Sequence, residues 1–373
     1  MITENFLKNN DPKVDKTGEW FPVSEPYLSG NESKYVNDAL VNNEISSQGK
    51  YVKLFAKEFA RRVGCQYGVA TSSGFTALYL ALRALGVREG DEIICPTFTM
   101  IATPNAIRLC GAKPIFVDCK EDGNIDEKLI EEKITLKTKG IVPVHIYGKV
   151  CEMDFINDLA RKYDLFVLED AAEAHGACYK GRKAGSLGNA AAFSFYANKI
   201  VTSGEGGIIT TNSQEIALTA SNLRDYAFSR ERHFWHKEFA INGRMSNLEG
   251  ALGLAQTEKM KEYIESRRQW ALGYQKLEEL DIKVERYSKE DVCWMAGARI
   301  KNRDEFREKL AKVGIETRTW FIPCHLQPIY YNKDRYPISE KLSQIGLYLP
   351  TYSYYNKEKQ QKIINLIKKI WRI

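Results

Sequence analysis

The 373-residue sequence predicts an α/β protein: a large domain built on a mostly parallel seven-stranded sheet flanked by helices, and a smaller C-terminal α/β domain. Two observations predict this fold. Between residues 67 and 211, short apolar runs rich in Val, Ile and Phe alternate with longer segments of helical periodicity. After Asn212 the alternation stops, and from about Leu280 a different pattern of strand-like and helical segments runs to the C-terminus.

Seven apolar runs are the expected strands of the main sheet, and several are apolar throughout, as strands covered on both faces are. They span residues 67–71, 92–96, 114–118, 140–144, 165–170, 190–195 and 207–211. Apolar residues at helical spacing predict helices between these strands. The helices span residues 76–85, 101–110, 126–134 and 152–163. This alternation predicts helices on both faces of the sheet.

We expect the chain to form three parts: an N-terminal arm over residues 1–30, a large domain over 31–260 and a small C-terminal domain over 261–373. The last helix carries apolar and basic residues on opposite sides. Ile363, Ile364, Ile367, Ile370 and Trp371 form one side, and Lys362, Lys368 and Lys369 form the other. Such an amphipathic face is typical of core packing rather than of membrane or partner binding.

The composition excludes several classes of function. With 44% hydrophobic and 27% charged residues and a mean hydropathy of −0.39, the chain resembles ordinary globular proteins. It has no apolar run of about 18 residues that could span a membrane and no N-terminal signal, so we expect a cytoplasmic protein with no membrane partner. A net charge of +6, with basic and acidic residues interspersed, suits small anionic ligands and does not indicate nucleic acid.

The eight cysteines are scattered, mostly inside apolar runs, and no C-x-x-C pair or histidine cluster is present. They are interpreted as reduced core thiols, and no metal site is expected. Motifs of rival chemistries are also missing from the sequence: there is no G-x-S-x-G, no G-x-x-x-x-G-K-[ST], no G-x-G-x-x-G after the first strand and no H-E-x-x-H.

Lys199 lies in a short polar turn between two apolar strands, in the segment Ser194-Phe195-Tyr196-Ala197-Asn198-Lys199. Two aromatic residues of the same segment wall it in. Removal of a lysine amine from water lowers its pKa from about 10.4 and makes it a nucleophile toward carbonyl groups, so Lys199 is a candidate for forming a Schiff base. The alternative from this segment alone is a surface lysine in a loop.

The apolar run 165–168 leads directly into two acidic residues, Glu169 and Asp170, and small residues follow them. This pattern places a charge in the crevice where open parallel sheets bind ligands. A buried carboxylate needs a cation or several donors, and the protonated ring nitrogen of pyridoxal phosphate (PLP) is one such cation. The alternative is a helix N-cap or a structural ion pair.

The segment Thr71-Ser72-Ser73-Gly74-Phe75-Thr76 joins a strand to a strongly apolar helix. Free backbone N–H groups and hydroxyls at the start of a helix can bind a phosphate. The same residues are also common helix caps, which is the alternative interpretation. His145 and His175 follow apolar strands at the same edge of the sheet, although a lone histidine is more often a packing residue.

Together and in this order, these motifs resemble the DegT/DnrJ/EryC1/StrS family of sugar aminotransferases, over residues 23–350. The resemblance rests on segments 22–32, 45–49, 96–99, 116–118, 143–148, 169–176 and 194–207. It implies an aspartate-aminotransferase-like fold, type I of the PLP enzymes, and PLP as cofactor. It also implies an activity on nucleotide-linked keto sugars of the kind found in lipopolysaccharide O-antigens.

The resemblance implies a role for each residue of the cofactor site. Lys199 is the catalytic residue that holds PLP, Asp170 pairs with its ring nitrogen, and Glu173 lies beside its phenolic oxygen. The whole predicted cofactor site is Ser73, Gly74, Phe75, Thr76, Met100, Asp170, Ala172, Glu173, Ser194, Lys199 and Asn242. Asn242 reaches the phosphate of a neighbouring subunit in the family, which implies a homodimer with shared active sites. Phe75 and Met100 replace a usual Thr and a usual ring-stacking aromatic residue.

The expected substrates are a nucleotide-linked keto sugar and glutamate. Ser46, His145, Arg244, Arg318 and His325 are the predicted substrate-binding residues. Segments 235–245, 293–295 and 314–325 most resemble the family members that aminate C4 of GDP-4-keto-6-deoxymannose to give GDP-perosamine. On the substrate side, Glu44 and Glu249 replace a usual Trp and a usual Gln.

Three alternatives remain open at this point. The first is an aminotransferase acting on a UDP- or dTDP-linked keto sugar. The second is a PLP-dependent sugar dehydratase, although these enzymes carry a histidine where Lys199 stands. The third is a non-catalytic regulator built on the same fold, for which the sequence offers neither a recognition motif nor a clustered basic face.

Overall fold

The computed structural model describes residues 19–371 apart from 230 and 233, so the first eighteen residues of the predicted N-terminal arm lie outside the described residues. Its main sheet contains seven strands in the order β1-β9-β8-β5-β4-β2-β3. The strands are β1 (Tyr67–Thr71), β2 (Glu92–Pro96), β3 (Lys113–Val117), β4 (Thr138–Ile141), β5 (Phe166–Asp170), β8 (Ala190–Ser194) and β9 (Gly207–Thr211). β9 runs antiparallel to both of its neighbours, and the other neighbouring pairs are parallel. The predicted sheet is confirmed.

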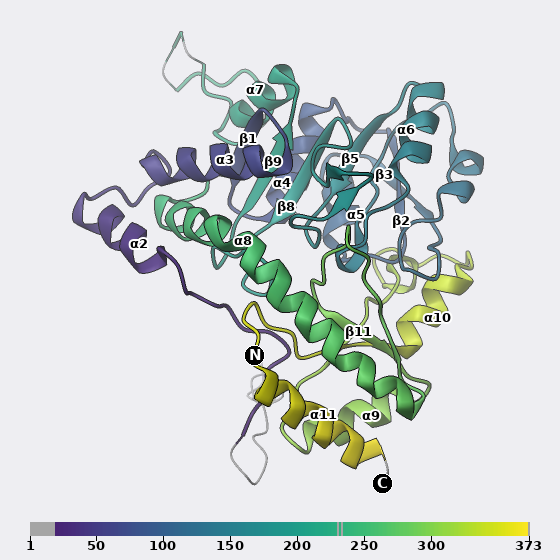
Figure 1. Cartoon of the computed structure of the whole chain (residues 1–373). Helices are drawn as coiled ribbons and strands as arrows, with labels where there is room; N and C mark the ends of the chain where they lie inside the picture. Colours follow the sequence, from purple (N-terminus) through teal and green to yellow (C-terminus); the bar gives the residue numbers. More distant parts are fainter. Residues whose placement is uncertain (1–18, 230, 233, 372–373) are drawn as a thin grey trace, which may run out of the picture.

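Helices cover both faces of this sheet (Figure 1). α4 (Gly74–Ala84), α5 (Ala102–Leu109) and α7 (Gln214–Leu223) bury apolar residues on one face. α3 (Lys50–Val63) and α8 (Asn247–Tyr274) pack on the opposite face together with α6 (Met153–Lys162), while α2 (Glu32–Val41) packs on α8. Because side chains alternate along a strand, Val69 of β1 joins the core under α4 and Ala70 joins the core under α3.

The helix predicted over residues 126–134 is wrong. Two 3-10 turns, η1 (Glu127–Leu129) and η2 (Glu131–Lys133), occupy the segment. The Asp126 carboxylate accepts the N–H of Lys128 at 3.1 Å and so closes a tight first turn. Within the segment only Ile130 is a fully buried apolar residue, while Ile134 is partly buried and Leu129 is exposed, so no continuous apolar face holds a longer helix on the core.

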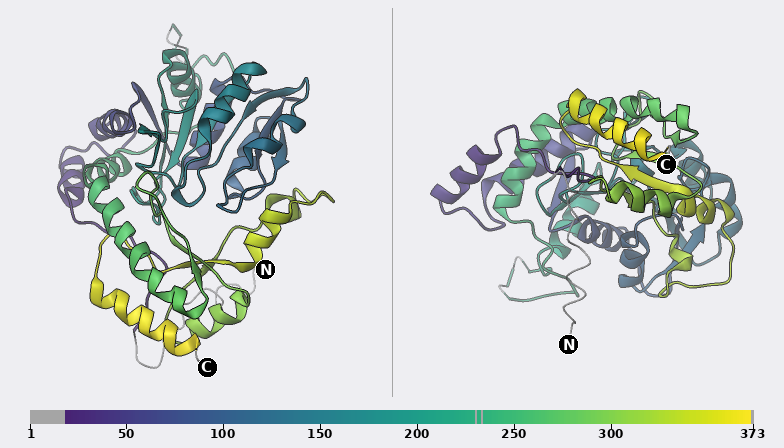
Figure 2. Two further views of the ribbon diagram at one scale, coloured as in Figure 1. Left: turned by 45° about the vertical axis from the view of Figure 1, so that its right-hand side comes forward. Right: turned by 90° about the horizontal axis from the view of Figure 1, so that it is seen from below.

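The C-terminal part has its own antiparallel sheet, with strand order β10-β11-β13-β12, and its own apolar core (Figure 2). Its strands are β10 (Lys283–Val284), β11 (Ala296–Arg299), β12 (Arg318–Thr319) and β13 (Gly346–Leu349). Its helices are α9 (Arg303–Ala311), α10 (Pro337–Ile345) and α11 (Lys357–Trp371), with turns η4 (Gln275–Leu280) and η5 (Cys324–Leu326). Ile363, Ile364 and Ile367 of α11 are buried, which confirms the predicted packing face.

α8 connects the two parts of the chain. In Figure 1 this 28-residue helix runs from α3 to the vicinity of α9 and α11, and it is continuous across the predicted boundary between residues 260 and 261. At the other end of the chain, Phe21 pairs with Ile315, so the described beginning of the arm packs on the C-terminal part. The domain limits stay a prediction. The hairpin β6 (Cys178–Tyr179) and β7 (Arg182–Lys183) and the turn η3 (Ile146–Gly148) complete the elements.

Candidate active site

Lys199 lies in the turn that follows β8, at the carboxyl edge of the main sheet. Its side chain is buried, and its Nζ lies 3.6 Å from a carboxylate oxygen of Glu173 and 4.2 Å from the centroid of the Trp294 ring. Burial lowers the pKa of the Lys199 amine, although the charges of Glu173 and Asp170 oppose that shift. The geometry therefore excludes an ordinary surface lysine and gives an amine with an increased population of its nucleophilic neutral form.

Glu173 is the carboxylate that faces this amine. Its other oxygen accepts the backbone N–H of Tyr147 at 2.9 Å, in the η3 turn where the φ of Tyr147 is 56°. Burial raises the pKa of Glu173 to about 7, even though the nearby Lys199 charge lowers it. Burial thus favours the neutral form of both side chains and brings their pKa values closer together.

Asp170 ends β5 and points toward α5. Its carboxylate accepts the Thr103 hydroxyl at 2.6 Å and the Ala172 N–H at 3.2 Å, and neither donor is charged. Burial raises the pKa of Asp170, while the Thr103 hydrogen bond is the largest influence in the opposite direction. A carboxylate in this position is stabilised by a cationic ligand.

The start of α4 meets the end of β8. Ser73 caps the helix: its Oγ accepts the Thr76 N–H at 3.1 Å and lies 2.9 Å from the Thr76 hydroxyl. A Cβ on Gly74 would lie 2.6 Å from the Cβ of Ser194, so only glycine allows the helix start to approach this serine so closely. Hydroxyls and the first N–H groups of α4 converge here, which is the donor set that binds a phosphate.

The other predicted cofactor residues lie around this group. Phe75 is 37% exposed and Met100, just before α5, is 53% exposed, while Ala172 is partly buried. Asn242 lies beside the start of α4, because the carbonyl of the next residue, Gly243, accepts the Ser72 N–H at 2.9 Å. The Asn242 side chain is exposed there.

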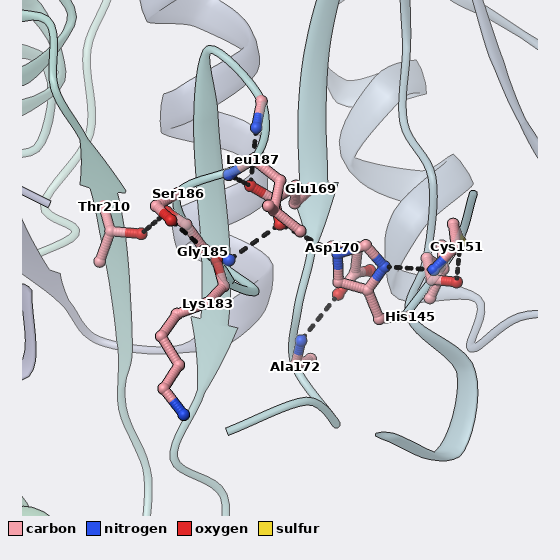
Figure 3. Close-up of polar contacts among 12 residues, drawn as sticks. His145, Cys151, Glu169, Asp170, Ala172, Lys183, Gly185, Ser186, Leu187 and Thr210 are labelled. Carbon is pink, nitrogen blue, oxygen red and sulfur yellow. Dashed lines mark hydrogen bonds and ion pairs between the residues drawn. The ribbon is translucent and has the colours of Figure 1, made fainter. Parts of the chain in front are cut away.

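Two of the predicted substrate residues are fully buried. The His145 ring is 0% exposed and has protein partners at both nitrogens: Nε2 lies 3.0 Å from Glu169, and Nδ1 accepts the Cys151 N–H (Figure 3). His325 is equally buried, with Nδ1 2.8 Å from the Thr97 hydroxyl and Nε2 3.5 Å from Glu340. The His145 ring is therefore bonded at both nitrogens, whereas the His325 ring has, among the described residues, a hydrogen bond at Nδ1 and none at Nε2.

The remaining predicted substrate residues lie at or near the surface. Ser46 and Arg318 are exposed, and Arg318 pairs with Glu316 at 3.4 Å. Arg244 forms an ion pair with Asp225 and lies over the Tyr226 ring. Glu249, in contrast, is used locally: its carboxylate accepts the Ser246 N–H in the capping box of α8.

Sequence reasoning missed three residues of this site. Thr103 supports Asp170, Trp294 covers the Lys199 amine, and Arg267 of α8 lies 3.3 Å from the Lys199 carbonyl oxygen. Thr103, near the start of α5, stands four residues after Thr99, whose hydroxyl lies 3.4 Å away, and this spacing was an available signal. The other two come from distant segments, and no local pattern marks them.

These residues fit PLP. The helix start supplies phosphate donors, Asp170 lacks a charged donor of its own and can pair with a ring nitrogen, and Lys199 is a desolvated amine suited to an aldehyde. Within residues 19–371 as described, no cluster of His, Cys, Asp or Glu could hold a metal ion, and no helix has both the length and the apolarity to cross a membrane. The fold and the site define a PLP-dependent aminotransferase.

Comparison with known proteins agrees with this assignment. The model of the DegT/DnrJ/EryC1/StrS aminotransferase family matches residues 26–368, and the chain belongs to this family. The GDP-perosamine synthase of Escherichia coli O157:H7 is 41% identical over 347 residues, which cover 91% of this chain and 95% of that protein.

Solved structures agree as well. Helicobacter pylori PseC, an aminotransferase involved in the biosynthesis of pseudoaminic acid, superposes with a TM-score of 0.88 at 27% identity and covers 95% of this chain and 100% of its own. The sugar aminotransferase Spr1654 from Streptococcus pneumoniae, in its PLP-form, superposes with a TM-score of 0.88 at 26% identity. The match covers 95% of this chain and 99% of that chain. The predicted family, fold and cofactor are confirmed.

Proposed function

We propose that this aminotransferase moves an amino group from glutamate to C4 of GDP-4-keto-6-deoxymannose and so forms GDP-perosamine. The observation that carries this proposal is the 41% identity to the named synthase along nearly its whole length. Lys199 supports amination over the dehydratase alternative, because the dehydratases of the family carry histidine at this position.

We assign the proton transfers to Lys199. When bound, PLP supplies an aldehyde that carries the amino group and a ring that accepts electrons. The Lys199 amine takes the proton from the carbon of glutamate that loses its amino group and later delivers a proton to C4 of the sugar. Glu173, 3.6 Å away with a pKa raised to about 7, holds a proton that the amine can exchange.

The other residues of the site bind the cofactor and orient it. We assign Asp170 to keep a proton on the ring nitrogen, with Thr103 fixing the carboxylate. Ser73, Thr76 and Ser194 bind the phosphate, and this restricts the ring to a productive pose. Trp294 covers the amine and limits its access to water.

We keep Ser46, Arg244 and Arg318 as substrate contacts, because guanidinium groups suit a diphosphate. His145 and His325 are left out of this assignment, since both rings are fully buried. We also propose a homodimer in which Asn242 reaches the phosphate of the other copy, which the exposure of its side chain supports. The cytoplasm is the proposed location, which the eight free cysteines support.

The first test concerns the lysine. Borohydride reduction of the purified protein should attach a pyridoxyl mass to the peptide that contains Lys199. Lys199→Ala should retain phosphate-site affinity for PLP but lose amine transfer by at least about 1,000-fold, since both the attachment and the proton carrier are gone. Turnover close to wild type in this variant would contradict the assigned role.

The second test concerns the substrate. GDP-, UDP- and dTDP-linked 4-keto-6-deoxy sugars are each incubated with glutamate, and 2-oxoglutarate and the amino sugar are measured by mass spectrometry. We expect one 2-oxoglutarate per amino sugar and the highest kcat/KM for GDP-4-keto-6-deoxymannose. A better UDP or dTDP substrate refutes the substrate proposal, and loss of a sugar hydroxyl without 2-oxoglutarate identifies a dehydratase.

A further inference from the structure

Arg267 is a buried cation that the proposed reaction does not use. It lies in α8 and is 1% exposed. Burial lowers its pKa to about 10, and within the described residues its hydrogen bonds all go to hydroxyl and carbonyl oxygens and none to a carboxylate. Because a buried charge is costly unless it is paired or fully hydrogen-bonded, its contacts require an explanation.

The guanidinium donates to oxygen atoms that surround the Lys199 turn. Nε donates to Ser353 Oγ at 3.0 Å, and one terminal nitrogen donates to the Trp294 carbonyl. The other terminal nitrogen lies 3.3 Å from the Lys199 carbonyl oxygen and 3.5 Å from that of Asn198. Arg267 thus joins the backbone that carries the amine to the backbone of the residue whose ring lies over the amine.

Further hydrogen bonds close this group. The Trp294 Nε1 donates to the Asn198 carbonyl at 3.0 Å, and the Ser353 hydroxyl donates to the Ile200 carbonyl at 3.4 Å. Residues 198–200 therefore present three successive carbonyls to donors of the C-terminal part and of α8. The turn cannot shift without breaking several of these bonds at once.

We propose that Arg267 is a positioning residue for the reaction: its guanidinium fixes the Lys199 backbone against Trp294, and so sets where the Lys199 amine lies. The inference rests on the proposed function, because it concerns the lysine assigned there to proton transfer. A displacement of about 1 Å at a reacting group can reduce a rate about 100-fold, so an anchor of this kind affects kcat.

The charge of Arg267 adds a second, separable effect. The charged groups that face the Lys199 amine are Glu173 and Asp170, which raise its pKa, and Arg267, which lowers it. Removing the guanidinium charge therefore raises the pKa of that nitrogen. A lysine at position 267 keeps the charge, but its ammonium lacks the planar fork that serves several carbonyls.

The test compares Arg267→Lys and Arg267→Met in the PLP-loaded enzyme, with Arg268→Met as matched control. Arg268 is the next residue of α8, but its guanidinium is partly exposed and bonds the Lys289 and Asp291 carbonyls. Three quantities are measured: kcat and KM, the thermal midpoint, and the pH midpoint of the visible absorbance of bound PLP, which reports the proton on the nitrogen joining it to Lys199.

We expect Arg267→Lys to lower kcat about 10- to 100-fold with KM for both substrates within about threefold of wild type, and with little change of the pH midpoint. Arg267→Met should lower kcat similarly and move the pH midpoint upward, while Arg268→Met changes neither. If Arg267→Met does not fold, the kcat of Arg267→Lys alone tests the proposal. If neither variant folds, the kcat of Ser353→Ala tests the proposal, since this substitution removes one acceptor of the Arg267 guanidinium.

Wild-type kcat and an unmoved pH midpoint in folded Arg267 variants, with or without a lower thermal midpoint, overturn the proposal and leave Arg267 a purely structural residue. Wild-type kcat in the deciding Ser353→Ala variant does the same. Failure of the proposed function is recognised separately, because the borohydride-fixed mass would then be missing from the Lys199 peptide of the wild-type enzyme.

Discussion

Burial alone brings the Lys199 amine and the Glu173 carboxyl toward the same pH range. In water their pKa values lie about six units apart. In the site, burial lowers the pKa of the amine and raises that of the carboxyl to about 7. The pKa values of two ordinary side chains 3.6 Å apart are thereby brought closer together, without any unusual chemical group.

The raised pKa of Glu173 predicts how the stability of the PLP-free protein depends on pH. Between pH 4.5 and about 7 the folded chain holds a proton that the unfolded chain releases. The free energy of unfolding should therefore fall as pH rises through this window, by up to about 3 kcal/mol. Glu173→Gln does not titrate, so urea unfolding over the same window should show this fall in wild type and not in the variant. Parallel curves for the two proteins would contradict the prediction.

At this scale the sequence predicts residue types better than their directions. Lys199 and Asp170 are predicted from one turn and one strand end and Glu173 from the family resemblance, and the structure brings the three together. His145 also follows a strand end, but Glu169, which lies on the opposite side of β5 from Asp170, engages its ring. Which of two adjacent carboxylates a histidine meets depends on the sheet register, which no local pattern contains.

Several strands of the main sheet end at the same edge, and their ends carry the residues of the site. β1, β5 and β8 end there, and the antiparallel β9 between β1 and β8 brings the helix start at Ser73 beside Ser194. The apolar runs predict most strand limits to within a residue or two, because burial on both faces leaves a continuous signal. Segment 126–134 fails because Ile130 is its only fully buried apolar residue, and a single anchor does not define a helical face.

The start of α4 gives a prediction for this element. Ser73→Ala and Ser213→Ala each remove an N-cap serine, of α4 and of α7, whose Oγ accepts the N–H three residues on. Each change should cost about 1 kcal/mol of stability. Since Ser73 also faces the phosphate site, Ser73→Ala alone should raise the Kd for PLP, by about tenfold. Fluorescence titration with PLP measures this, and equal affinities in the two variants would refute the phosphate assignment of Ser73.

Across the whole molecule, the site depends on contacts between the two parts of the chain. Trp294 and Ser353 come from the C-terminal part, and Arg267 lies on the helix that joins both parts. Sequence separations of 27 to 153 residues join these groups to one another and to the Lys199 turn. The alternation of strands and helices predicts each part but not how the parts face each other, which is why this half of the site was missed.

An ion network holds the two parts together, and its centre is Glu285. This buried carboxylate lies 2.6 Å from Lys149 Nζ, which follows η3, and 2.7 Å from Arg299 Nε in β11. Arg299 also reaches Glu121, which is about half exposed and pairs with Lys341 as well. The two carboxylates thus belong to one network but differ in their exposure to water.

That difference predicts unequal effects of the same substitution. Glu285→Gln leaves the largely buried Lys149 without its carboxylate and removes the buried one of the two carboxylates that Arg299 contacts, which should lower the free energy of unfolding by about 3 kcal/mol. Glu121→Gln acts where water screens the pair, so the loss should stay below about 1 kcal/mol. Urea unfolding followed by circular dichroism, with both variants in the same buffer, measures the two values. Similar losses would mean that the network does not hold the parts together through Glu285, because a buried hub and an exposed branch would then contribute alike.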